Sequence, residues 1–138
     1  MSWFDPRNFL AESSIYQFLD QKFDAASQNI STVRAVANGA FFDTDGYAKV
    51  ILNAAQSADV NANLIAAIIR QEQGVKGTSP LISGTCTAYN NAYYGIYNYF
   101  NIGAYTSIEM TTVERGLWYA KGSGKGETTY GRPWTTKT

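Results

Sequence analysis

The sequence predicts a single, mainly helical α+β domain in which helices surround a small lobe of β or loop structure. Three observations lead to this fold class: apolar residues recur with helical spacing through the first half of the chain, the segment 77–105 changes to Gly, Ser, Thr, Asn and Tyr with short β-prone runs, and helical spacing resumes after residue 111. A length of 138 residues suffices for one domain with a hydrophobic core and is short for two. We therefore expect one domain over residues 1–138.

The elements follow in order from their apolar faces and turn residues. An amphipathic helix is expected around residues 15–23, and a short second helix over 31–38. A third helix should begin at Tyr47, and its expected inner face is Tyr47, Val50, Ile51, Ala54 and Ala55. These helices should pack against one another as a bundle.

The second half begins with the lobe and ends in a helix. Residues 93–100 form the longest β-prone run, and we expect them in a small β or loop lobe. Thr111 and Glu114 have the spacing of a capping box, so a helix should start there and end at the glycine-rich loop that begins at Gly122.

Glu72 is the most informative residue of the chain. It lies near the end of an expected helix over residues 61–74, four residues after Ile68, on a stripe formed by Leu64, Ile65, Ile68 and Ile69. We therefore expect its carboxylate near the core face, in the last turn before the helix cap at Gly74, where the helix dipole and partial burial both disfavour a negative charge. Such surroundings suit a general acid. The alternative is a rim glutamate paired with Arg70 or Lys76.

Composition excludes several kinds of chemistry. The chain has no histidine, which removes Ser-His-Asp and Cys-His catalysis and most zinc sites, and its single cysteine, Cys86, cannot form an internal disulfide. The turn 43–46, Asp-Thr-Asp-Gly, resembles the start of a calcium loop but lacks the later glutamate, so we expect no metal and no cofactor. Carboxylate chemistry remains.

The charge balance bears on partners. Eleven basic and eleven acidic residues cancel and are well mixed, so we expect no nucleic-acid partner. No apolar run approaches about 18 residues, so we expect no membrane insertion. The expected partner is a neutral polymer or a small molecule, and the expected state is a monomer.

Aromatic residues are unusually frequent, with ten Tyr, seven Phe and three Trp, and they concentrate in the second half. Aromatic rings cover the C–H faces of sugars and their polar tips form hydrogen bonds, so this composition suits sugar binding, with an aromatic core as the alternative. The candidate substrate-binding aromatic residues are Tyr97, Tyr99, Phe100, Tyr105, Trp118 and Tyr119.

Glycosidic cleavage needs an acid and often a second carboxylate. Glu109 is the best second candidate because it precedes a helix next to the lobe, whereas the capping box accounts for Glu114 and Glu127 lies in a glycine-rich loop. A solvated loop glutamate is the alternative for Glu109. If no second carboxylate is within reach, the N-acetyl group of the substrate can act as the nucleophile, oriented by a tyrosine of the lobe such as Tyr97, Tyr99 or Tyr105. The sequence leaves these mechanisms open.

Six segments in order cover nearly the whole chain and carry a family resemblance: residues 4–10, 51–55, 69–74, 80–85, 97–104 and 115–120. They resemble the endo-β-N-acetylglucosaminidase domains of bacterial autolysins, glycoside hydrolase family 73, and especially those of clostridial and related cell-wall hydrolases.

The resemblance implies a lysozyme-like α+β fold and hydrolysis of the β-1,4 bond after N-acetylglucosamine in peptidoglycan. It maps the catalytic glutamate of the family onto Glu72, and it implies glycan contact or support of the cleft by Tyr97, Phe100 and Asn101 in the motif 97–104, Tyr-Asn-Tyr-Phe-Asn-Ile-Gly-Ala. It also implies peptidoglycan glycan strands as the partner and an extracellular, cell-wall or phage-associated location.

The chain departs from the family at its end, because members usually continue past the Gly-Arg-Pro-Trp segment 131–134 with a further helix. The expected domain is therefore shortened at the C-terminus. Two alternatives to the glucosaminidase stay open: a glycan-binding module without activity on a lysozyme-like fold, and a muramidase-type lysin that cuts after N-acetylmuramic acid.

Overall fold

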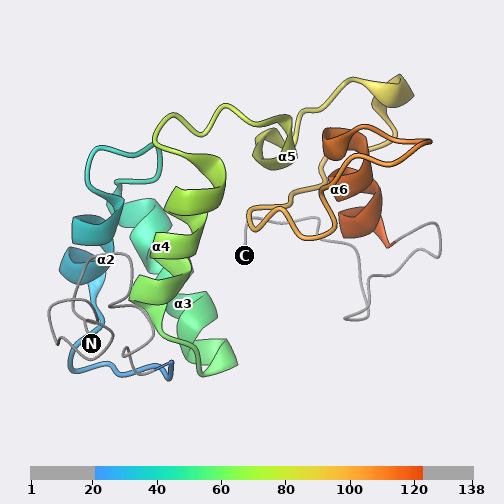
Figure 1. Ribbon diagram of the computed structural model, residues 1–138. Helices are drawn as coiled ribbons and strands as arrows, with labels where there is room; N and C mark the ends of the chain where they lie inside the picture. Colours follow the sequence, from blue (N-terminus) through green and yellow to red (C-terminus); the bar gives the residue numbers. More distant parts are fainter. Residues whose placement is uncertain (1–20, 123–138) are drawn as a thin grey trace, which may run out of the picture.

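The computed structural model describes residues 21–122, which form two groups of helices (Figure 1). The first group, here called the helical lobe, contains α2 (Ile30–Ala37), α3 (Asp45–Ala58) and α4 (Ala62–Gln73). The second group, called the loop lobe, contains α5 (Pro80–Ser83), the 3-10 turn η2 (Tyr89–Asn91) and α6 (Thr112–Lys121). The described part of the chain is mainly helical.

Polar caps set the helix boundaries in the helical lobe. Asn29 and Thr32 form a capping box at the start of α2, the Thr44 side chain caps α3, and the Asn61 side chain accepts hydrogen bonds from two backbone N–H groups at the start of α4. Gly74 ends α4 with a φ of 65°, a conformation that costs a glycine little. The expected second helix and the expected cap of the Glu72 helix are thus confirmed, the second helix starting one residue earlier than predicted.

Each lobe has its own hydrophobic cluster. In the helical lobe, α2, α3 and α4 pack on one another around Val33, Phe42, Ile51 and other buried residues. In the loop lobe, α5 packs on α6, and Leu81 and Leu117 are among the buried residues. Phe41 and Tyr99 contact both clusters and so join the two lobes.

The predicted β structure is absent from residues 21–122, which contain no strand. The β-prone run 93–100 is broken by Gly95, which has a φ of 75°, and is followed by Asn101 and Gly103, which also have positive φ. An extended strand requires negative φ throughout, so these residues turn the chain instead. Isolated backbone hydrogen bonds, such as the one from Gly95 N–H to Gly84 O (2.7 Å), hold these turns in place of a ladder between strands. The lobe is therefore a loop lobe.

Other predictions about the elements have mixed outcomes. Of the predicted inner face of α3, Ile51 and Ala55 are buried, and Tyr47, Val50 and Ala54 are partly buried. Helix α6 starts after the Thr111 cap and ends before Gly122, as predicted. Most of the predicted helix at 15–23 lies outside the described residues, and Phe23 is not helical. No helix between residues 21 and 122 combines the length and apolarity that crossing a bilayer requires.

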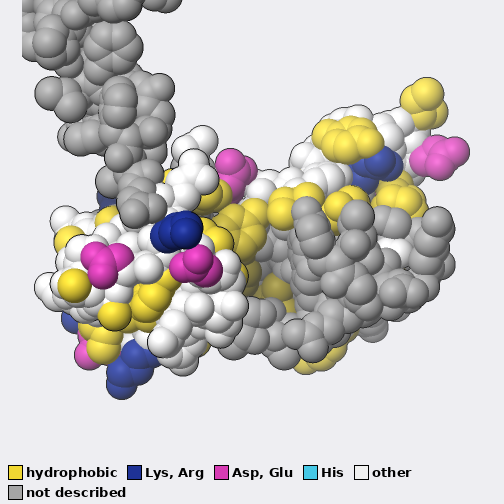
Figure 2. Space-filling model, turned by 90° about the horizontal axis from the view of Figure 1, so that it is seen from below, with side chains coloured by type: hydrophobic (Ala, Val, Ile, Leu, Met, Phe, Trp, Pro, Cys, Tyr) yellow, Lys and Arg dark blue, Asp and Glu magenta, His cyan; other side chains and the backbone are white. Residues whose placement is uncertain are grey.

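Charged side chains are mixed on the surface. On the face drawn in Figure 2, the blue and magenta side chains of the described residues lie scattered among white and yellow ones. This distribution agrees with the even mixture of basic and acidic residues along the sequence.

Candidate active site

Glu72 lies in the last turn of α4, at the end of the helical lobe that adjoins the loop lobe. The buried face of α4 consists of Ala62, Ala66, Ile69 and Gln73, while Ile68 is 36% exposed and Glu72 is exposed as well. The expectation that Glu72 is partly buried on the core face is therefore wrong. The stripe has the predicted helical spacing, but the core contacts the neighbouring side of the helix, which Gln73 shares.

Asn101 of the loop lobe holds Glu72 in place. Its side-chain Nδ2 donates one hydrogen bond to the Glu72 carboxylate oxygen Oε2 (3.0 Å) and another to the Glu72 backbone carbonyl (3.1 Å). Asn101 has a φ of 52°, a left-handed conformation that asparagine tolerates better than most residues. The second carboxylate oxygen, Oε1, has no hydrogen-bond partner within residues 21–122.

Gln73 fixes the orientation of the Asn101 side chain. The Gln73 side chain is buried, and its Nε2 donates to the Tyr99 carbonyl (2.8 Å) and to Oδ1 of Asn101 (2.9 Å). Two neighbouring residues of α4 thus bond the Asn101 amide: the Glu72 carboxylate accepts from its nitrogen, and the Gln73 amide donates to its oxygen.

Asn98 holds the loop that carries Asn101. It is 1% exposed, and its Nδ2 donates to the carbonyls of Ile102 (2.8 Å) and Gly116 (3.0 Å) while its Oδ1 accepts from Ile102 N–H (3.1 Å). A buried amide with all these partners fixes the turn 98–102 against α6. The Asn101 side chain is thereby presented to the end of α4.

No cation neutralises Glu72 in the described residues. Arg70 donates instead to the backbone carbonyls of Val36 (2.7 Å) and Asn38 (3.0 Å), and Lys76 forms no ion pair there. A rim ion pair with Arg70 or Lys76 is thus not the arrangement of this site.

Glu109 is not brought to Glu72. It is exposed in the turn 107–110, closed by a hydrogen bond from Ser107 N–H to Met110 O (3.0 Å), and this orange turn projects from α6 on the side away from α4 (Figure 1). Thr111 Oγ1 accepts from the backbone N–H of Glu114 (3.3 Å), so the first half of the predicted capping box is present. Glu127 lies outside the described residues.

Two of the candidate tyrosines are parts of the scaffold. Tyr97 packs on Gly84, where an added Cβ would lie 2.2 Å from the Tyr97 ring, and it stacks on Tyr99 with ring centroids 6.5 Å apart. Tyr99 packs between both clusters, and burial, followed by the neighbouring Tyr47 hydroxyl, raises the pKa of its phenol well above the usual value. The side chain of Tyr99 therefore supports the junction of the lobes.

The remaining candidate aromatic residues differ in exposure. Phe100 (39%) and Tyr105 (55%) are exposed, whereas Trp118 packs against the loop-lobe cluster and Tyr119 covers Gly103, where an added Cβ would lie 2.7 Å from the Tyr119 ring. The Arg115 guanidinium lies 4.0 Å from the centroid of the Tyr105 ring and donates to its hydroxyl. Phe100 and Tyr105 are thus the candidates with surface free for a ligand.

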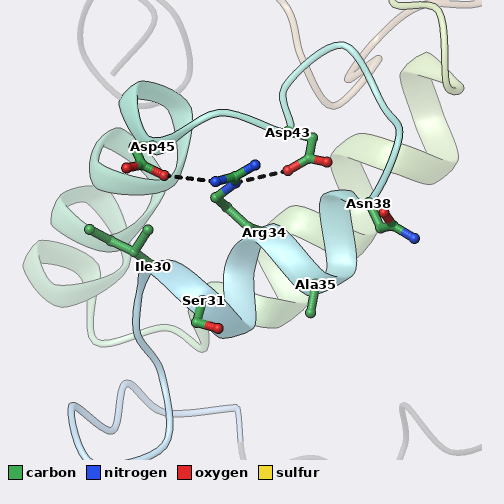
Figure 3. Close-up of a pocket in the computed structure, with 7 residues that line it drawn as sticks. All are labelled: Ile30, Ser31, Arg34, Ala35, Asn38, Asp43 and Asp45. Carbon is green, nitrogen blue, oxygen red and sulfur yellow. Dashed lines mark hydrogen bonds and ion pairs between the residues drawn. The ribbon is translucent and has the colours of Figure 1, made fainter.

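The acidic turn 43–46 has a structural partner. Figure 3 shows Arg34 between the two carboxylates, with Nε 2.9 Å from Asp43 and Nη1 3.1 Å from Asp45, at an open pocket on α2. The Gly39 N–H, which donates to Asp43 (3.1 Å), and then Arg34 lower the pKa of the Asp43 carboxyl. The described residues contain no cluster of three or more potential metal ligands.

Sequence reasoning missed Gln73 and the structural role of Asn98. Gln73 lies four residues after the buried Ile69, and a polar side chain on a buried helix face predicts a group with hydrogen-bond partners inside the protein. The sequence alone does not give this signal, because it depends on which face of α4 is buried.

Comparisons of the chain with protein-family models, with curated proteins and with solved structures found no match.

Proposed function

We propose that the protein is a peptidoglycan hydrolase that cleaves the β-1,4 bond after N-acetylglucosamine, with Glu72 as general acid, on a lysozyme-like fold. One observation carries the proposal: an exposed carboxylate at the end of α4 is held through one oxygen by an amide of the opposite lobe, which leaves the other oxygen open to a ligand. The motif order from residue 4 to residue 120 supports the choice of substrate.

In the proposed reaction the protonated Glu72 carboxyl donates its proton to the glycosidic oxygen as the bond from that oxygen to the sugar C1 breaks. The mechanism proposed here is attack of the substrate's N-acetyl oxygen on C1, which needs no second carboxylate. It is chosen because the turn 107–110, which carries Glu109, projects from α6 on the side away from α4 (Figure 1). Water then opens the resulting ring at C1, and Glu72 takes up the proton of that water. Phe100 and Tyr105 are the proposed glycan-binding surface.

Digestion of purified peptidoglycan tests the proposal. The parent should release fragments that end in reduced N-acetylglucosamine after borohydride treatment, as identified by mass spectrometry. Glu72→Gln should slow release by about a hundredfold or more, the usual contribution of a general acid. Asp59→Asn is the matched control, because it makes the same carboxylate-to-amide change at an exposed left-handed position (φ 52°) that asparagine tolerates.

Two other results would replace the proposal. Fragments that end in reduced N-acetylmuramic acid would indicate a muramidase. A second candidate function, a glycan-binding module without turnover, is favoured by the turn 107–110, which carries Glu109 and projects from α6 on the side away from α4 (Figure 1). Wall binding without fragments from either parent or variant would establish that function instead.

A further inference from the structure

We propose that Asn101 is the positioning residue of Glu72 and that it selects Oε1 as the oxygen from which the carboxyl proton leaves. This inference rests on the proposed function for its catalytic part, but its structural part concerns only the contact between the two side chains. It assigns to Asn101 a role other than glycan contact.

The orientation of both amides is determined by main-chain carbonyls, which can only accept hydrogen bonds. The Tyr99 carbonyl requires that the Gln73 nitrogen point toward it, and the same nitrogen then faces the Asn101 oxygen. The Glu72 carbonyl independently requires the Asn101 nitrogen on the other side. Neither amide can be turned over without facing oxygen against oxygen, so the group that meets Glu72 Oε2 is an N–H donor.

The donor restricts where a proton can sit on Glu72. Because Oε2 accepts the Asn101 hydrogen bond, a carboxyl proton is accommodated on Oε1, the oxygen that has no hydrogen-bond partner within residues 21–122. The two N–H groups and the oxygen of Asn101 are all engaged, so the side chain has no donor left for a sugar. The Asn101 side chain therefore acts through Glu72.

None of the other charged or ionisable groups near this end of α4 bonds the Glu72 carboxylate within the described residues. Arg70 donates to carbonyls of the helical lobe, the Tyr99 hydroxyl is buried, and Lys76 forms no ion pair there. Asn101 is the side chain that bonds the Glu72 carboxylate there.

Asn101→Gly tests the role of the amide without backbone strain, since glycine readily adopts a φ of 52°. We expect kcat to fall about tenfold to a hundredfold, the range for losing one hydrogen bond to a charged group, with KM changed less than about twofold. Asn91→Gly is the matched control, because Asn91 is an exposed asparagine with a φ of 60°. A raised KM with unchanged kcat would overturn the proposal in favour of glycan contact, and unchanged kinetics would overturn it outright.

Asn101→Asp keeps the shape of the side chain and the acceptor for Gln73 but places a second carboxylate against Glu72. Two carboxylates at this distance share a proton, so we expect the basic limb of the kcat profile to move up by about one pH unit or more. A residue that only held the loop would lower stability without moving the profile.

An NMR measurement that needs no catalytic turnover tests the contact between Asn101 and Glu72 independently of the proposed function. In the ¹⁵N-labelled parent, the side-chain amide signal of Asn101, identified by its loss in Asn101→Gly, should follow a single carboxylate titration, and Glu72→Gln should abolish that response. A response that persists in Glu72→Gln, or no response in the parent, would refute the contact. If the parent cleaves no peptidoglycan but the response is present, the proposed function fails and the assignment of Asn101 as the partner of Glu72 stands.

Discussion

Replacing Asn98 with alanine removes three hydrogen bonds that fix the turn 98–102, of which the bond to the Gly116 carbonyl is fully buried. At about 1 kcal/mol net for each bond, the free energy of unfolding should fall by about 3 kcal/mol. That is a large share of the roughly 5–15 kcal/mol typical of a domain, and it corresponds to a decrease in Tm of roughly 10 °C.

Urea unfolding followed by circular dichroism measures this loss directly. Asn53→Ala is the matched control, because Asn53 is exposed in the middle of α3, where alanine favours the helix, and stability should be unchanged or slightly raised. Asn98→Asp refines the test: an aspartate there faces two carbonyls, so its folded pKa should lie above the unfolded value. Its stability should therefore be greatest below about pH 4 and be lost as the pH rises. A loss below about 1 kcal/mol in Asn98→Ala would refute the reasoning that this amide organises the loop lobe.

Three further predictions concern packing and titration. Gly84→Ala should lower the free energy of unfolding by about 2 kcal/mol or more, because the added Cβ would lie 2.2 Å from the Tyr97 ring. Gly39→Ala is also at positive φ but has no atom within 4 Å of the added Cβ, so it should lower the free energy of unfolding by about 1 kcal/mol. Urea unfolding of both variants measures the difference. The pKa of Asp43 is lower in the folded state than in the unfolded state, so its carboxylate stabilises the fold above the unfolded-state pKa. This stabilisation is lost as the pH falls through the folded-state pKa, so Asp43→Asn should flatten the decrease in Tm below about pH 4. The raised pKa of Tyr99 contributes stability below about pH 10 that is lost at higher pH, so Tyr99→Phe should unfold less steeply with alkali, as followed by phenolate absorbance and circular dichroism.

The helices could be predicted from the sequence because their signals are local. The cap at Thr111 and the stops at Gly74 and Gly122 follow from the sequence and stand at the helix ends. The β-prone run at 93–100 was misleading because tyrosine and isoleucine favour strands, whereas the positive φ values at Gly95 and Asn101 dominate the backbone path.

The site could be predicted only in part, because it depends on contacts between segments far apart in the chain. Helical spacing placed Glu72 at the end of its helix, but a shift of the buried face toward Ile69 and Gln73 left the carboxylate exposed. The partner that holds it, Asn101, is 29 residues away in sequence, and local spacing carries no information about such a pair.

Phe41 and Tyr99 each belong to the surroundings of both hydrophobic clusters, so the lobes share packing through two rings. Sub-global opening between the lobes would release Asn101 from Glu72 while α2, α3 and α4 stay folded. Such an opened form would keep much of its helical content but lose the contact that positions the Glu72 carboxylate. Heat or denaturant should therefore abolish the proposed hydrolase activity before helicity is lost.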